Sequence, residues 1–350
     1  MRRSITYLAF FLLLSITVSC GSGETVSNHW ESTKHVIAFT KVTSGVEGNV
    51  ATIWITDADG RHPHMLVKGG GPSVSPNGRW VTFWRDFTAT YGAPLYVYDR
   101  DTREAHMLLR HVYSPVIWSS DSKTLILNVA VKNTALTAIE SVDPVTGRSK
   151  VLVRGEINNV SIGPDRRWVV FDSVSGAATG ETKTDLFAVR ADGGRQIRLT
   201  NDGLSSNPIV GYGSIAYERA TPKRTWPAEV WVLPFDGQAI GRANRVGPHV
   251  HAFSPGAHWV PIGWWPGGRS LLIGVNPDQH GYSSLYRVDI RTKALHEVIA
   301  SPSLFRDVEL SKDGVLVLAT YGSGAIKIVS IKNGRVVQYV GKGDAATWNR

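Results

Sequence analysis

A strand–turn–strand pattern recurs along this chain at a nearly constant interval. The last residue of its second apolar stretch falls at Phe39, Phe83, Leu127, Phe171 and Tyr217, so that successive copies are 44, 44, 44 and 46 residues apart. A unit this short cannot bury its apolar faces alone and needs neighbouring copies to form a core. The spacing therefore predicts a stack or ring of similar units within one domain.

The turns between the paired strands carry residues that resemble catalytic groups. Asn77-Gly78 and Asp313-Gly314 occupy the same place in their copies, where Gly accepts a positive φ and Asn or Asp bonds nearby backbone. We therefore predict that these pairs form turns. The strand–turn–strand copies are 74–83, 118–127 and 162–171, followed by the more divergent 210–217, 264–273 and 310–319.

Each copy continues with a third strand and a polar turn, and short fourth strands such as 64–69, 106–110 and 197–200 follow. The seven third strands are 52–60, 95–102, 137–147, 186–194, 230–238, 285–293 and 326–334. Four antiparallel strands per unit, without helical periodicity, are typical of a propeller blade. The sequence predicts an all-β protein, a β-propeller of seven four-stranded blades, with six or eight blades as alternatives.

The repeat resembles the TolB-type repeat, also called the WD40-like or PD40 repeat, over about residues 35 to 350. This resemblance implies a role in the assembly or maintenance of the bacterial cell envelope. TolB carries an α/β domain before its propeller, and this chain has only a short segment there. The partners of TolB are therefore not carried over.

Two segments compete for the innermost strand of the first blade. Trp30 lies nine residues before Phe39, and Trp348 in the C-terminal segment 345–350 aligns with Trp118 and Trp264. We favour the C-terminal segment, because pairing of the two ends of the chain would close the ring.

The N-terminus has the pattern of a signal peptide. Arg2 and Arg3 precede an apolar stretch, Tyr7–Leu14, which is too short to span a bilayer. The segment then ends at Cys20, the only cysteine of the chain, in a context that resembles the lipobox of bacterial lipoproteins. The resemblance implies a signal peptide over 1–19, a lipidated cysteine and tether over 20–33 and a single propeller domain over 34–350.

The alternative is an ordinary secretory signal with an incidental cysteine. If the lipobox is genuine, the protein is anchored by lipid in the cell envelope. In a Gram-negative cell, an aspartate directly after the lipidated cysteine would retain the protein in the inner membrane. Gly21 occupies that position here, which favours the periplasmic side of the outer membrane.

Basic residues are spread along the chain and do not form long runs. The formal net charge is +9, from 38 Lys and Arg against 29 Asp and Glu. Without a basic cluster, a nucleic-acid partner is disfavoured. A polyanionic glycan or an anionic lipid is a more natural electrostatic neighbour outside the cell.

The long insertions all fall on one face of the predicted propeller, where second-to-third-strand loops and inter-blade loops meet. They are 85–93, 173–185, 218–229, 248–260 and 276–284. Functional residues concentrate in such loops, and Arg, His and aromatic side chains suit a protein or glycan interface, although any one aromatic could instead pack between blades. The candidate binding face comprises Arg85, Phe87, Tyr91, His111, Tyr113, Lys223, Arg224, Trp226, His249, His251, His258, Trp259, His280 and Tyr282.

Four histidines of this face are weak candidates for a metal site. His249 and His251 would project to one side of an extended strand, and His258 and His280 could join them to bind zinc or manganese. Some oligogalacturonate lyases, which resemble this repeat, carry histidine-bound metal, but no motif here lets their residues be carried over. No carboxylate lies at a fixed spacing, so we predict neither a metal nor a cofactor.

The sequence contains no G-x-S-x-G, H-E-x-x-H or P-loop motif. We therefore expect a non-enzymatic scaffold, a monomer or a component of an envelope complex, that binds a protein or an envelope polymer. The alternative is a metal-dependent polysaccharide lyase or hydrolase that uses the histidine cluster.

Overall fold

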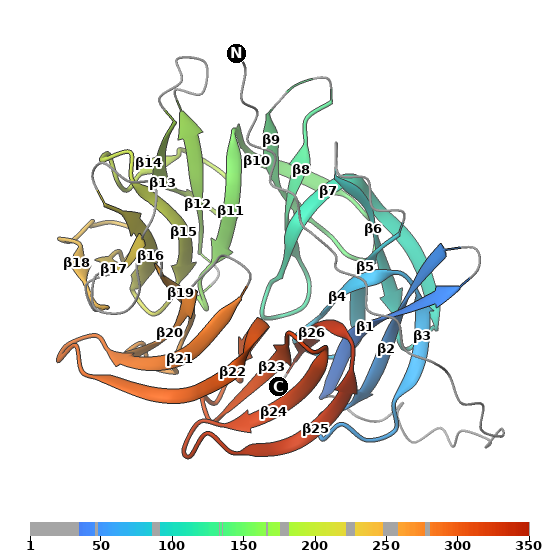
Figure 1. The fold of residues 1–350 in the computed structure, drawn as a ribbon. Coiled ribbons are helices and arrows are strands. Elements are labelled where there is room, and N and C mark those ends of the chain that lie inside the picture. Colours follow the sequence, from blue (N-terminus) through green and yellow to red (C-terminus); the bar gives the residue numbers. More distant parts are fainter. Residues whose placement is uncertain are drawn as a thin grey trace, which may run out of the picture.

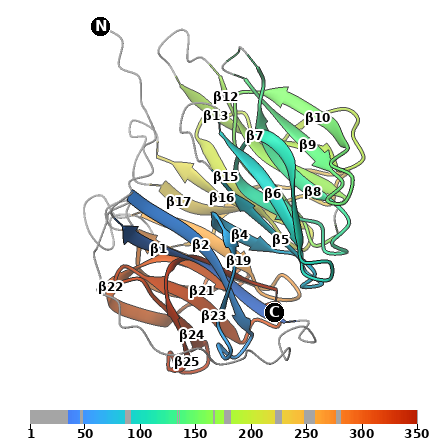
Figure 2. The same cartoon turned by 90° about the vertical axis from the view of Figure 1, so that its right-hand side faces the viewer.

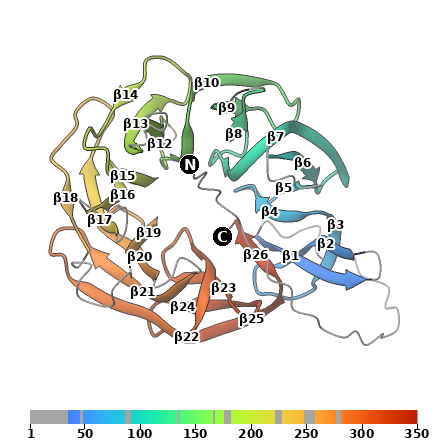
Figure 3. The ribbon, with the colours of Figure 1, turned by 45° about the horizontal axis from the view of Figure 1, so that its top comes forward.

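The computed structural model describes residues 35–45, 48–85, 92–132, 134, 136–165, 167–175, 182–221, 228–247, 258–276 and 281–349. Every regular element within these ranges is a β-strand, and none of them contains a helix that could span a membrane. The strands form five antiparallel sheets around a common centre, as Figure 3 shows. The fold is an all-β propeller, as the sequence predicts.

The first sheet joins the two ends of the described chain. Trp348 pairs with Ile37, and Thr347 pairs with Ala38. The C-terminal segment therefore supplies the innermost strand, while Trp30 lies outside the described residues. The spatial order is β26 (Asp344–Trp348), β1 (Val36–Gly45), β2 (Gly48–Asp57) and β3 (His64–Lys68).

Two further sheets contain four strands each, and in both the spatial order follows the chain. The first comprises β11 (Ile157–Ile162), β12 (Trp168–Ser175), β13 (Lys183–Arg190) and β14 (Ile197–Arg198). The second comprises β15 (Ser205–Val210), β16 (Ser214–Ala220), β17 (Ala228–Pro234) and β18 (Asn244–Arg245).

The last two sheets contain seven strands each. In each sheet one long strand forms the outermost strand of one repeat unit and continues as the innermost strand of the next unit. One sheet comprises β4 (Gly70–Val74), β5 (Trp80–Trp84), β6 (Ala93–Asp99), β7 (Glu104–Trp118), β8 (Leu125–Ala130), β9 (Thr137–Val142) and β10 (Ser149–Gly155). The other comprises β19 (His258–Trp264), β20 (Ser270–Asn276), β21 (Tyr282–Asp289), β22 (Leu295–Leu310), β23 (Leu316–Tyr321), β24 (Ala325–Ser330) and β25 (Val336–Lys342). The seven-blade prediction depends on assigning the two halves of β7 and of β22 to different blades, and we use "blade" in that sense below.

The repeat register coincides with the core. Phe39, Phe83, Leu127, Phe171 and Tyr217 are each at most 2% exposed. They lie on second strands, which are buried on both faces because each blade packs between two neighbours. Outer strands such as β10 are largely exposed.

The apolar clusters lie between blades. One of them joins Ile37 and Phe39 of β1 to Leu318 of β23 and Ile326 of β24, together with Trp348. Figures 1 and 2 both show β1 and β2 beside β23–β25. The first and last blades are therefore held together by packing as well as by the strand pairing of β26.

The predicted turns are confirmed. Gly78 and Gly314 have φ values of 75° and 71°. The Ser311 hydroxyl donates to Asp313 Oδ1 at 2.5 Å and accepts the Leu316 N–H at 3.0 Å. Because the turn aspartate is used in this way, it is not available for catalysis.

Candidate functional site

A cavity of about 380 Å³ lies where the innermost strands of the last, first and second blades meet. It is at the end of the blades that carries the long loops, since β21 begins there directly after 277–280. Its lining residues come from β4, β21, β22 and β26 and are Pro72, Tyr282, Arg306, Asp307, Val308, Glu309, Ala345, Ala346 and Thr347.

Two carboxyl groups on β22 line the cavity, and strand β26 holds both. Asp307 and Glu309 are two residues apart in a strand, so their side chains project to the same face. The Trp348 N–H donates to Glu309 Oε2 at 3.2 Å, and the Ala345 N–H donates to Asp307. Ala345 has a φ of 49°, at the point where the β1–β26 register shifts. This irregularity in β26 directs its N–H groups toward the neighbouring blade.

The surroundings of these acids favour their neutral forms. Desolvation raises the pKa of Glu309 to about 7, against the opposing effect of the Trp348 hydrogen bond. Desolvation also raises the pKa of Asp307, and the nearby charge of Asp344 adds to the effect. Solvent still reaches Asp307 through the cavity, although protein atoms crowd its other sides.

Tyr282 occupies a space that the sequence leaves open. Ile273 and Tyr217 occupy equivalent positions in neighbouring blades. Tyr217 is followed by Glu218, whereas Ile273 is followed by Gly274, which has no side chain. A Cβ at Gly274 would lie 2.5 Å from the Tyr282 ring. Burial raises the pKa of Tyr282 to about 12. Tyr282 therefore stays a neutral phenol at physiological pH and can donate a hydrogen bond into the cavity.

A second acidic network lies between the fourth and fifth blades. Asp172, which is 0% exposed, accepts hydrogen bonds from the Asn159 N–H at 3.0 Å, from Asn159 Nδ2 at 2.8 Å and from the Asn207 N–H at 2.8 Å. Asn207 Nδ2 donates in turn to Glu218 Oε1 at 2.6 Å. Desolvation raises the pKa of Asp172, and it raises the pKa of Glu218 to about 7. This network ties one blade to the next, and both of its carboxyl groups are buried.

The structure places only part of the predicted binding face. Tyr282 lines the cavity, whereas the Arg85 guanidinium lies over the Tyr96 ring at 4.6 Å on its own blade. His111 is exposed and Tyr113 half-buried, both on β7. The predicted residues outside the described ranges are Cys20, Phe87, Tyr91, Lys223, Arg224, Trp226, His249, His251 and His280.

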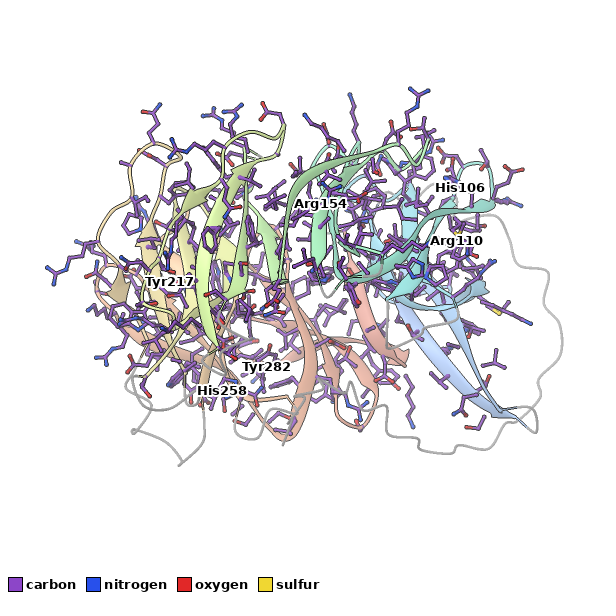
Figure 4. The ribbon with its side chains drawn as sticks, turned by 90° about the horizontal axis from the view of Figure 1, so that it is seen from above. His106, Arg110, Arg154, Tyr217, His258 and Tyr282 are labelled. Atoms are coloured by element: carbon purple, nitrogen blue, oxygen red, sulfur yellow. The ribbon has the colours of Figure 1, made fainter. Side chains whose placement is uncertain are left out.

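Two predicted face residues belong instead to the interior. Trp259 is 2% exposed and packs in an apolar cluster with Val230 and Ile273, and His258 is 4% exposed. The loop prediction was wrong for both, because β19 begins at His258, where it pairs with Asn276. In Figure 4, His258 and Tyr282 lie toward the same end of the blades.

The histidine hypothesis is tested at one position only. Burial lowers the pKa of His258 to about 4, so its ring is neutral. Within the described residues, no three His, Cys, Asp or Glu side chains are grouped so that they could hold a metal ion. The other three histidine candidates lie outside these residues.

Asp307 and Glu309 were missed from the sequence. They lie four and two residues before the turn Ser311, where other copies have no acid, as with Pro115 and Ile117 before Ser119. Aligning the copies on the turn serine would have shown two acids in one innermost strand. It would not have shown that β26 lies opposite them.

The fold and this cavity define a β-propeller with an acidic pocket on its inner wall. The solved structures with similar folds include an oligogalacturonate lyase in complex with manganese (16% identity, 89% of both chains, TM-score 0.61). Others are TolB from Acinetobacter baumannii (16% identity, 90% of this chain and 82% of that one, TM-score 0.54) and the β-propeller domain of the Trilobed protease from Pyrococcus furiosus (11% identity, 90% and 94%, TM-score 0.65).

The chain matches no protein-family profile and no curated protein sequence. At these identities the structural likeness shows the fold alone. The similar structures include TolB as well as enzymes, so the likeness supports a TolB-like propeller without choosing between a scaffold and a catalyst.

Proposed function

We propose that this chain is a lipid-anchored cell-envelope protein that binds a protein or an envelope polymer at the long-loop end of its propeller. The observation that carries the proposal is the cavity at that end, in which two carboxyl groups are already fixed by hydrogen bonds from another blade. Groups held in place before binding lose little freedom on association, which favours a binding site.

The cavity offers groups for recognition on a rigid support. Carboxyl groups, a phenol and a guanidinium line it together with the small apolar surfaces of Pro72 and Ala346. Its walls are strands of a packed ring, and it opens at the end of the blades where β21 begins. A partner that reaches the loops could therefore place one of its own groups in the cavity.

Partner capture from envelope extract tests the binding face. Three purified proteins would be compared: the wild type, a variant with 249–256 replaced by a Gly/Ser segment of equal length, and the control variant Lys332→Ala/Arg335→Ala. The control changes the exposed β24–β25 turn at the opposite end of the blades. We expect the same partner with wild type and control and its loss with the loop variant. Equal recovery with all three proteins would contradict the proposal.

Cell fractionation tests the anchor separately. The wild type should remain with the membrane fraction, and Cys20→Ala should move to the soluble secreted fraction without the mass of the lipid. Membrane attachment that persists in the variant would refute the lipid anchor.

Metal analysis tests the alternative of a metal-dependent lyase or hydrolase. Stoichiometric, tightly bound manganese or zinc that is lost in His251→Ala would overturn the scaffold-only role.

A further inference from the structure

The cavity contains more acidic than basic groups, on a chain that is positively charged overall. Three acids, Asp307, Glu309 and Asp344, lie near two cationic groups, Arg306 and Lys312, whereas the whole chain has a net charge of +9. Arg306 Nη1 lies 3.1 Å from Asp344 Oδ1, at the partly exposed edge of the cavity. In the part of the chain that the structure describes, neither Asp307 nor Glu309 forms an ion pair. The two inner acids thus have hydrogen-bond donors from β26 but no cationic group within ion-pair distance among the described residues.

A buried hydroxyl beneath the acids also has unused bonding capacity. Thr320 on β23 pairs with Asp307 on β22, so both side chains project to the same face of the sheet. Thr320 is 1% exposed, and its Oγ1 has no hydrogen-bond partner among the described residues. Most buried polar groups are paired, and a shift of Asp307 toward this hydroxyl is one way to pair it when a ligand is bound.

We propose that the cavity binds the ammonium or guanidinium group of a basic side chain from a protein partner, with Asp307 and Glu309 as its counter-charges. This inference rests on the proposed function, because the partner must approach from the long-loop end. A volume of about 380 Å³ lies within the range of roughly 300–1,000 Å³ of small-molecule sites. Pro72 and Ala346 provide apolar surface for the aliphatic part of the side chain.

Other classes of ligand fit the charges less well. An anionic group would be repelled by any ionised carboxylate, and a neutral polyol would not stabilise the ionised forms that desolvation disfavours. A basic side chain compensates the charge and also donates hydrogen bonds to carboxylate oxygens. Arg306 repels such a ligand from the edge of the cavity, so its removal and the removal of an acid have opposite expected effects.

The test uses the folded chain and a short peptide as the probe. Binding of acetyl-Gly-Lys-Gly-amide at low salt would be measured by NMR titration, with the Nε-acetyllysine peptide as the uncharged comparison. We expect the lysine peptide to bind and the acetylated peptide to bind at least tenfold more weakly. Equal binding of both peptides, or binding of neither, would overturn the inference.

Three variants locate the binding. Asp307→Asn, which keeps the size of the side chain, should weaken lysine-peptide binding about tenfold, and Arg306→Gln should strengthen it. Asp59→Asn, at an exposed acid in a turn of the first blade, should leave it unchanged. Unchanged binding in Asp307→Asn with the wild-type melting temperature would also overturn the inference.

The two proposals can fail separately. If partner capture depends on the long loops but the lysine peptide does not bind, the inference is wrong and the proposed function stands. If the lysine peptide binds through Asp307 but capture is independent of the loops, the proposed function is wrong and the cavity chemistry stands.

Discussion

The substitution Trp348→Ala tests whether the C-terminal strand closes the ring. Trp348 is 3% exposed and packs with Ile37, Phe39 and Leu318 from the first and last blades. Its indole Nε1 has no hydrogen-bond partner among the described residues, so the substitution removes packing and not a hydrogen bond. Replacing a buried Trp with Ala costs about 3–5 kcal/mol.

The expected shift in melting temperature follows from the size of the domain. An unfolding entropy of about 2.1 cal/mol/K per residue gives roughly 0.6 kcal/mol/K for a domain of about 300 residues. The loss of about 3–5 kcal/mol therefore corresponds to a melting temperature roughly 5–8 °C lower. Deletion of 344–350 should lower it further, because it also removes the β1–β26 pairing and the 2.8 Å bond from the Val36 N–H to Asn349 Oδ1.

Thermal unfolding followed by circular dichroism measures the effect. The matched control is Tyr339→Ala, which removes an aromatic side chain that is 49% exposed on the outer strand β25. Exposed substitutions usually change stability by no more than about 0.5 kcal/mol, so the control should melt within about 1 °C of the wild type. A Trp348→Ala protein that melts within that same interval would refute the role assigned to β26.

The remaining predictions concern the buried acids. The pKa of Glu218 is raised from 4.5 to about 7, so the folded state binds this proton more tightly than the unfolded state. The contribution of Glu218 to wild-type stability should therefore grow as the pH falls from about 7 to 4.5. Glu218→Gln should lack this gain in melts at about pH 5.5 and about pH 7.5, and an identical gain in both proteins would disprove the assignment. Asp172→Ala should be destabilised by about 3 kcal/mol or more in urea unfolding, because buried donors of Asn159 and Asn207 lose their acceptor, whereas Asp172→Asn should lose less. Lysine-peptide binding should strengthen from about pH 6 to about pH 8 as Glu309 ionises, and a flat profile would contradict this role of Glu309.

Several groups near Glu309 also affect how lysine-peptide binding depends on pH. Asp307 and Lys312 act on Glu309, Asp344 and Arg306 act on Asp307, and Tyr282 lines the same cavity. Tyr282 stays neutral over this range because its pKa is about 12. Asp307 also has a raised pKa, so the profile reports the two inner acids together and Glu309→Gln separates them.

The fold was predictable because its information is local and repeated. The register residue of each copy is buried, and the turn residues Asn77 and Asp313 each accept a hydrogen bond from a serine hydroxyl in their own blade. The error at Trp259 has a local cause as well. The apparent loop 248–260 ends inside a strand, and a strand boundary is poorly defined by a sequence without strict alternation.

The site was not predictable in the same way, because it depends on contacts between distant segments. Glu309 becomes a rigid acceptor only when the Trp348 N–H, 39 residues later, lies against it. Tyr282 was identified as a candidate from its loop, but Gly274, which makes room for its ring, looks unremarkable in the sequence. The first relation requires the closed ring, and the second requires the packing of side chains on the neighbouring strands β20 and β21.

Closure of the ring and formation of the cavity are therefore a single event. Strand β26 pairs with β1 and places Trp348 in the core, and the same strand donates the N–H groups that hold Asp307 and Glu309. A substitution that loosens β26 should weaken lysine-peptide binding before the protein unfolds, because the acids lose their donors while the other blades remain packed. Trp348→Ala should thus bind the peptide more weakly even well below its melting temperature, and Asp172→Ala, between the fourth and fifth blades, should not. Equal weakening in both variants would show that the cavity responds to general destabilisation and not to the strand that builds it.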